Sequence, residues 1–364
     1  MTAHQQAVSQ IAAYPFGSTA VGPVPSADWA RRLDAIAMHR IAGHAVQAAA
    51  AGDLALTGSQ TNELYLRHEE QLALDLHVEA MLLRCEEALA NASIPTRLLK
   101  GPSIAHRFFP NPALRSFGDG DVLVRGTDMT RAIDTLTSAG FARRFGAPRR
   151  FFDSRYVKAV TLVAPDGLEL DLHRAIAPGP FGVLIDPDSI FSAPHDEVTL
   201  GSRSVACLST ELALLHACVH ATLGDVSPRL VALRDVVQIL HSGVDEGLTI
   251  DYFSRYQCGI VAQRAVQLVS RVLGVDLVGS FAEWARAFEP THVDEARLRA
   301  YSRSDKRYVA QAASTFWTLP SLRQRIEFAA ALAFPKREYV RDRDRTYARR
   351  LTRSTTSVMR WRPR

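Results

Sequence analysis

Apolar residues recur at helical spacing in the N-terminal quarter of the chain. Residues 29–51 and 61–92 predict two helices, and in the second of them Leu64, Leu72, Leu76 and Leu83 recur among charged positions. The segment before them is rich in Gly, Pro and Ala and predicts irregular structure over residues 1–27.

The middle of the chain changes to short apolar runs separated by turns. Pro165-Asp166-Gly167 separates two alternating segments, 157–163 and 168–176, and this pattern predicts a β-hairpin. The other elements expected here are strands at 94–99 and 121–124 and helices at 104–109 and 127–141.

Helical periodicity returns after Ser209. Gly243 and Gly274 fit C-terminal stops of two of the expected helices. The helices expected here cover 210–223, 228–243, 260–274 and 322–334. The whole pattern predicts the α+β class, with a small mixed β-sheet core between an N-terminal helical segment and a C-terminal helical domain. The predicted divisions are 1–27 (irregular), 28–92 (N-terminal helices), 93–204 (core), 205–335 (helical domain) and 336–364 (basic tail).

Composition places the chain among globular proteins. It has 364 residues, of which 47% are hydrophobic and 22% charged, and its four cysteines include no CxxC pair. No apolar run reaches the roughly 18 residues that a membrane span needs, and the first ten residues lack the order of a secretory signal. These features predict a reduced, cytoplasmic protein without a membrane span.

The positive charge is concentrated at the C-terminus. Residues 336–364 hold eleven Lys or Arg and three Asp or Glu, so the tail carries +8 while the whole chain carries +5. The tail is interpreted first as a solvated terminus, with weak contacts to nucleic acid or another anionic surface as the alternative.

Carboxylates are the candidate chemistry of the core. Asp119 and Asp121 flank Gly120 at the start of a predicted strand, so their side chains share one face, about 6.5–7 Å apart. On the polar side of a second strand, Asp171 or Glu169 could approach the pair if the predicted hairpin lies beside the 121–124 strand. Converging carboxylates suit hard divalent ions such as Mg²⁺, and two such ions can clamp a phosphoryl transfer. A solvated strand edge or an Asx turn is the alternative for the pair alone.

A turn with candidate anion-binding groups precedes these acids. Gly101 permits a tight turn, Ser103 could cap the helix that follows, and Lys100 adds a positive charge. Arg115 is a further candidate phosphate contact. The alternative is an ordinary strand–turn–helix connection.

Two histidines have the i, i+4 spacing of some zinc sites. His216 and His220 lie on a predicted helix, but no Glu follows His216 as in HExxH. They are interpreted as core histidines, with Asp235 as the kind of partner expected.

The run IPTRLLKGPSIAHRFFPNPALRSFGDGDVLVRGTDMTRAIDTLTSAGF, residues 94–141, resembles an uncharacterised bacterial nucleotidyltransferase family of the polymerase-β-like superfamily. The Lys-Gly turn, the DxD strand and the later Asp171-Leu172-His173 carry the resemblance. It implies two Mg²⁺ ions, with Mn²⁺ as an alternative, and a nucleoside triphosphate (NTP), for instance ATP, as donor. Asp119, Asp121 and Asp171 would be the catalytic metal ligands, and Lys100, Gly101, Ser103 and Arg115 would hold the triphosphate.

The expected function is therefore Mg-dependent transfer of a nucleoside monophosphate to an unknown acceptor, which could be a small molecule, a protein or RNA. Two departures from the family pattern favour an alternative, a catalytically inactive nucleotide-sensing or partner-binding module. Pro102 removes a backbone donor from the turn, and Gly120 stands where an apolar residue is usual.

Overall fold

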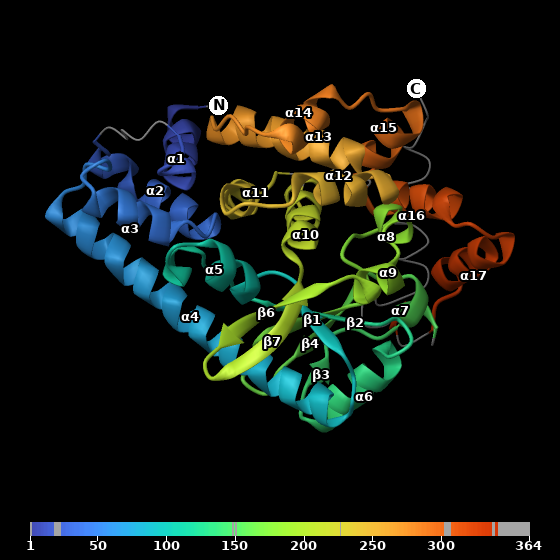
Figure 1. The fold of residues 1–364 in the computed structure, drawn as a ribbon. Coiled ribbons are helices and arrows are strands. Elements are labelled where there is room, and N and C mark those ends of the chain that lie inside the picture. Colours follow the sequence, from blue (N-terminus) through green and yellow to red (C-terminus); the bar gives the residue numbers. More distant parts are fainter. Residues whose placement is uncertain are drawn as a thin grey trace.

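A mixed β-sheet lies at the centre of the molecule (Figure 1). The computed structural model describes residues 2–17, 23–147, 149, 151–225, 227–301, 307–336 and 339–340. Within them, seven strands follow the order β3-β4-β5-β2-β1-β7-β6. The strands are β1 (Thr96–Leu98), β2 (Gly120–Val124), β3 (Ala142–Arg143), β4 (Ala159–Val163), β5 (Glu169–His173), β6 (His195–Leu200) and β7 (Arg203–Leu208). Because β2–β5 and β1–β7 are parallel and the other pairs antiparallel, the sheet is mixed, and the predicted α+β class is confirmed.

Helices precede, interrupt and follow the sheet. The N-terminal ones are α1 (Ala3–Ala13), α2 (Ser26–Met38), α3 (Ala42–Ala50) and α4 (Gly58–Asn91). Those between strands are α5 (Pro102–Phe108), the short η1 (Pro112–Leu114), α6 (Met129–Ser138), α7 (Phe152–Arg155), α8 (Phe181–Leu184) and α9 (Pro187–Ser192). After the sheet come α10 (Thr210–Leu223), α11 (Leu230–His241), α12 (Glu246–Arg255), α13 (Gly259–Leu268), the π-helical η2 (Val269–Leu273), α14 (Ser280–Ala287), α15 (His292–Arg299), α16 (Arg307–Thr318) and α17 (Leu322–Ala333).

The two faces of the sheet are covered by different helices. On one face, Val122 and Leu172 pack with buried residues of α4 and α6 in one hydrophobic cluster. On the other face, Leu123 belongs to a second cluster, which the N-terminal and C-terminal helices form together. Figure 1 shows α4 and α6 on one side of the sheet and α10 to α15 on the other. Side chains that alternate along β2 and β5 therefore point either into the first cluster or toward the second layer of helices.

Several expected elements are present at the predicted places. The hairpin of β4 and β5 turns at Gly167, whose φ is 87°, and the stops at Gly243 and Gly274 have φ of 89° and 67°. The expected helix over 29–51 is interrupted instead, since Arg40 has a φ of 57° between α2 and α3. The β6–β7 hairpin was not expected from the sequence.

The prediction of irregular structure for residues 1–27 is wrong in its first half. Helix α1 begins after Thr2, whose side chain accepts a hydrogen bond from the Gln5 amide while the Gln5 side chain bonds the Thr2 amide. This capping box was visible in the sequence as Thr-x-x-Gln. The predicted basic tail, 336–364, lies outside the described residues apart from Lys336, Tyr339 and Val340.

Gly120, which seemed a weakness of the strand, is required by the packing of α4. A Cβ built on Gly120 would lie 2.7 Å from Met81 Cε and 2.8 Å from Leu82 Cδ2, and both side chains are fully buried. Position 120 faces away from the two aspartates, and a side chain there would force the Met81 and Leu82 side chains of α4 to move.

We expect Gly120→Ala to destabilise the fold by about 1–3 kcal/mol because Met81 and Leu82 must shift in a closed core. Urea denaturation measures this. Gly58→Ala is the matched control, since a Cβ at Gly58 meets nothing within 4 Å, and it should leave stability unchanged or slightly raised. Equal stability of the Gly120→Ala variant and the wild type would contradict the packing argument.

Candidate active site

Parallel pairing of β2 and β5 brings two of the predicted carboxylates together. Asp121 and Asp171 are direct partners in the register, so their side chains leave the sheet on the same face. Asp121 is buried, with 3% of its side chain exposed, and Asp171 is half-buried. Thr161 on β4 donates a hydrogen bond of 2.7 Å to Asp171 Oδ1 and fixes that carboxylate.

His173 completes a cluster with these two acids. One potential ligand atom from each of Asp121, Asp171 and His173 lies within 4.8 Å of the others. The ring is fully buried, its Nδ1 is 3.3 Å from the Ala175 carbonyl, and its Nε2 is 2.8 Å from Asp121 Oδ1. Both neighbours accept hydrogen bonds, so a neutral ring can donate to only one of them. The 2.8 Å contact with Asp121 is a hydrogen bond only when Nε2 carries the proton. With the proton on Nδ1 instead, Nε2 would present a lone pair toward the carboxylates, the arrangement common for a metal-ligating histidine.

Asp119 lies next to this cluster but takes other partners. It immediately precedes β2, and its side chain is 30% exposed. Arg40, from the junction of α2 and α3, contacts Asp119 Oδ1 at 3.1 Å. Lys100 Nζ lies 3.4 Å from Asp119 Oδ2 and 2.7 Å from Asp121 Oδ2, so one ammonium group bridges both acids. The structure thus brings Asp121 and Asp171 together and keeps Asp119 as a neighbour bound to cations.

The bridging lysine sets the charges of the site. Burial alone would raise the pKa of Asp121, but Lys100 and the hydrogen bond with His173 outweigh it and hold that pKa well below its usual range. The pKa of Asp119 is lowered as well, because Lys100 and Arg40 outweigh burial and the repulsion from Asp121. Burial opposes the charged form of Lys100, yet the two carboxylates raise its pKa. All three groups are therefore charged at neutral pH.

The Lys100–Ser103 turn is formed largely as expected, with one correction. Gly101 has a φ of 65° and precedes α5, and Pro102 occupies the first helical position, where its missing N–H costs little. Ser103 does not cap the helix. It lies inside the first turn of α5, it is 2% exposed, and its hydroxyl faces the Lys100 carbonyl at 3.5 Å.

Arg115 has a different role from the one the sequence suggested. It is 3% exposed, and its Nε and Nη2 donate to Asp235 on α11 at 3.1 and 2.7 Å. The Nε–Nη2 edge of the guanidinium is therefore occupied in a buried ion pair. Arg115 fixes the segment before Asp119 to the helical layer.

Comparison with known proteins was decisive for the family. The model of the family described as "Uncharacterised nucleotidyltransferase" matches residues 25–274, well over half of the chain. The chain belongs to this nucleotidyltransferase family. The match spans the helices α2 to α4, the whole sheet and the helices α10 to α13, and it leaves out α1.

Other comparisons add little to the family assignment. No curated protein matches the chain. A similar solved structure is the "Crystal structure of an antigenic nucleotidyltransferase-like protein from Paracoccidioides brasiliensis". It is 15% identical, the alignment covers 57% of this chain and 94% of that one, and the TM-score is 0.31. A likeness at this level says nothing about function.

The protein also has polar residues whose charges act on the acids and that sequence reasoning did not assign to the site. Burial and then the charge of Lys158 hold the pKa of His216 well below its usual range, and burial and then Lys100 do the same for His220. Burial lowers the pKa of Lys158, and so does Lys100. The expected pairing of these histidines with Asp235 is wrong, because Asp235 binds Arg115.

Asp75 on α4 holds the loop that leads to the site. Its Oδ1 accepts a 2.7 Å hydrogen bond from the Phe117 amide, and burial raises its pKa to about 7 although that bond, Arg115 and Arg40 oppose the shift. Because the folded-state pKa lies above the usual value of 3.8, the stability contributed by this group is full below about pH 4 and is lost as the pH rises to about 7.

We expect Asp75→Asn, which cannot ionise, to be more stable than wild type at pH 8, on the order of 1–2 kcal/mol. Near pH 4 the two proteins should be equally stable. Urea unfolding at both pH values measures the difference. A difference that is the same at both pH values would show that Asp75 does not carry the pH dependence.

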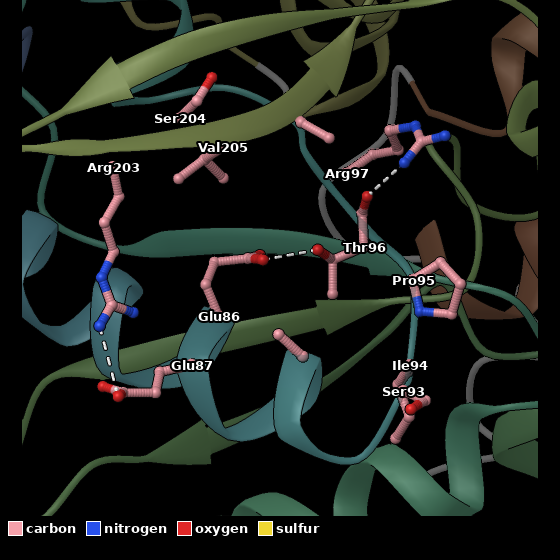
Figure 2. A pocket seen from close by; sticks show the side chains of 12 residues that line it. Glu86, Glu87, Ser93, Ile94, Pro95, Thr96, Arg97, Arg203, Ser204 and Val205 are labelled. Atoms are coloured by element: carbon pink, nitrogen blue, oxygen red, sulfur yellow. Dashed lines mark hydrogen bonds and ion pairs between the residues drawn. The ribbon is translucent and has the colours of Figure 1, made fainter.

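A separate cavity of about 540 Å³ lies away from the acids, between the end of α4, β1 and β7 (Figure 2). Two of its acidic groups are paired with residues of the cavity itself. Thr96 donates to Glu86 at 2.6 Å, and Arg203 pairs with Glu87 at 3.3 Å. No member of the acidic cluster lines it, so it is not part of the candidate site.

No helix in the described part of the chain is long and apolar enough to cross a membrane.

Proposed function

We propose that this protein transfers a nucleoside monophosphate from an NTP to an acceptor hydroxyl or phosphate, with a divalent metal, as the polymerase-β-like superfamily does. The observation that carries the proposal is the convergence of Asp121, Asp171 and His173 within 4.8 Å on one sheet face, in a chain of a nucleotidyltransferase family. Other classes of metal site would accept the same ligands, so the family match is the reason for preferring this reaction in the proposal.

The donor set of the cluster fits a divalent ion. Asp121 and Asp171 supply carboxylate oxygens, and His173 offers Nε2 when its Nδ1 proton is bound to the Ala175 carbonyl. Asp119 is the candidate ligand for a second ion. An imidazole in the set suits Mn²⁺ better than Mg²⁺, whereas carboxylates serve both. Bound metal would neutralise charge that develops on the transferred phosphoryl group.

The remaining work is done by residues of the chain itself. Lys100 and Arg40 provide positive charge beside the acids for a triphosphate. Asp171, fixed by Thr161, is the candidate for orienting or deprotonating the acceptor hydroxyl. Catalysis would consist mainly of positioning and charge neutralisation.

Incubation with cell lysate and labelled NTPs tests the proposal. With Mg²⁺ or Mn²⁺, addition of the protein should raise α-phosphate label in an acceptor above the level of lysate alone, should not raise γ-phosphate label, and should release pyrophosphate. Fractionation of the labelled species into small molecules, protein and RNA identifies the acceptor class. Transfer of γ-label, or equal α-labelling by an Asp171→Asn variant, would contradict the proposed reaction.

The bridging Lys100 favours one second candidate, an inactive module that binds nucleotide without chemistry. A permanent ion pair between Lys100 and both acids would leave no room for metal. Calorimetry with ATP, with and without Mg²⁺, separates the two. Binding of ATP that does not depend on Mg²⁺, without pyrophosphate release, would favour the inactive module.

A further inference from the structure

One ammonium group stands where a divalent ion would bind the acids. Lys100 Nζ lies 2.7 Å from Asp121 Oδ2 and 3.4 Å from Asp119 Oδ2, and the lysine side chain is 12% exposed. Its two carboxylate partners, Asp119 and Asp121, lie two residues apart at the start of β2, and Asp171 is next to Asp121 in the sheet. Removal of Lys100 alone would leave Asp121 buried and charged, with only the 2.8 Å contact to His173 Nε2 among the described side chains.

Metal and ammonium cannot both hold these oxygens. A divalent ion bound to Asp121 would lie within a few ångströms of Lys100 Nζ, and like charges at that distance repel strongly in a partly buried site. A metal therefore has to displace the lysine.

Lysine is suited to such an exchange. Its ammonium is a compact charge on a flexible four-carbon stem, so it can leave one anion and reach another without a change of the backbone. Arg115 provides the contrast in the same region, because its guanidinium is held by two hydrogen bonds to Asp235. The backbone at Lys100 is fixed by its place between β1 and the Gly101 turn, so only the side chain has to move.

We propose that the Lys100 ammonium occupies the metal position exchangeably. It neutralises the acids until metal and triphosphate bind together. This inference rests on the proposed function and adds the order of binding. Metal displaces the ammonium from Asp121, and the displaced ammonium binds a triphosphate oxygen. Metal alone would bind weakly, since the displaced lysine then has no anion to bind, and nucleotide would strengthen metal binding.

Titration of Mn²⁺ into the full-length protein without nucleotide, with free Mn²⁺ followed by electron paramagnetic resonance, tests this. Lys100→Met should bind Mn²⁺ at least about tenfold more tightly than wild type, a gain of about 1.4 kcal/mol. Lys158→Met is the matched control, since it removes a neighbouring charge that makes no ion pair with the acids within the described structure, and its affinity should stay within about threefold of wild type.

The inference is overturned if Lys100→Met binds Mn²⁺ no more tightly than wild type, or if Lys158→Met gains as much. Thermal melting covers the case in which Lys100→Met does not fold without metal. Refolding of that variant by added Mn²⁺ would support the exchange. If Mn²⁺ restores the fold of neither Lys100→Met nor the milder Lys100→Gln, the proposed exchange is overturned. The Mn²⁺ titration does not measure transfer. Absence of labelled acceptor with the wild type would therefore reject the proposed function, while the measured effect of Lys100→Met on Mn²⁺ affinity would still hold.

Discussion

Asp121→Asn is expected to reduce α-label transfer from NTP about a thousandfold, or about 4 kcal/mol in transition-state stabilisation. The asparagine keeps the shape of the side chain but removes the charge that Lys100 bridges and that a metal ion would need. Initial rates of labelled acceptor formation at saturating metal measure the effect.

Asp166→Asn is the control for this substitution. Asp166 lies in the exposed turn between β4 and β5, where it pairs with Arg84, and its replacement should leave the transfer rate unchanged. Circular dichroism checks that Asp121→Asn folds. A folded Asp121→Asn protein with more than a tenth of the wild-type rate would exclude Asp121 as an essential metal ligand.

Asp235→Ala is expected to lower the free energy of unfolding by about 3–5 kcal/mol. Arg115 and Asp235 are 3% and 2% exposed and make two parallel hydrogen bonds, so removal of the acid leaves a buried guanidinium unpaired. Urea denaturation of the purified protein measures the loss.

An exposed pair supplies the comparison. Arg67 and Glu70 on α4 lie 3.2 Å apart with side chains 41% and 67% exposed, and Glu70→Ala should cost less than about 1 kcal/mol. A double variant, Arg115→Met with Asp235→Leu, should recover much of the stability that Asp235→Ala loses. If Asp235→Ala costs no more than Glu70→Ala, the ion pair does not anchor the loop before Asp119.

Local signals were sufficient for the elements that carry the acids. The alternation along 168–176 and the Pro165-Asp166-Gly167 turn predicted the hairpin, and the structure pairs β4 with β5 in that way. The approach of Asp171 to Asp121 needed one further assumption, that the hairpin lies beside β2. The parallel register of β2 and β5 confirms it.

Residues distant in the sequence could not be placed in the site by such reasoning. Arg40 comes from a helix junction 79 residues before Asp119, and Asp235 lies 120 residues after Arg115. Only the packing of the helical layers on the sheet brings these charges together. Arg115 was expected to contact phosphate because a sequence does not show whether an arginine already has a buried partner.

Gly120 shows the same limit for packing. In the sequence it reads as a weak point of a strand, and its reason becomes visible only with Met81 and Leu82 of α4 pressed against it. His173 was noted as part of a motif, but its place in the cluster depends on the face that β5 turns toward Asp121.

The proposed chemistry depends on metal held between β2 and β5. Crystals grown with Mn²⁺ and a non-hydrolysable NTP, measured at the manganese absorption edge, test this directly. We predict an anomalous peak about 2.0–2.3 Å from carboxylate oxygens of Asp121 and Asp171, with Lys100 moved to a phosphate. Bound nucleotide with no peak at these carboxylates, and with Lys100 still bridging Asp119 and Asp121, would contradict the account.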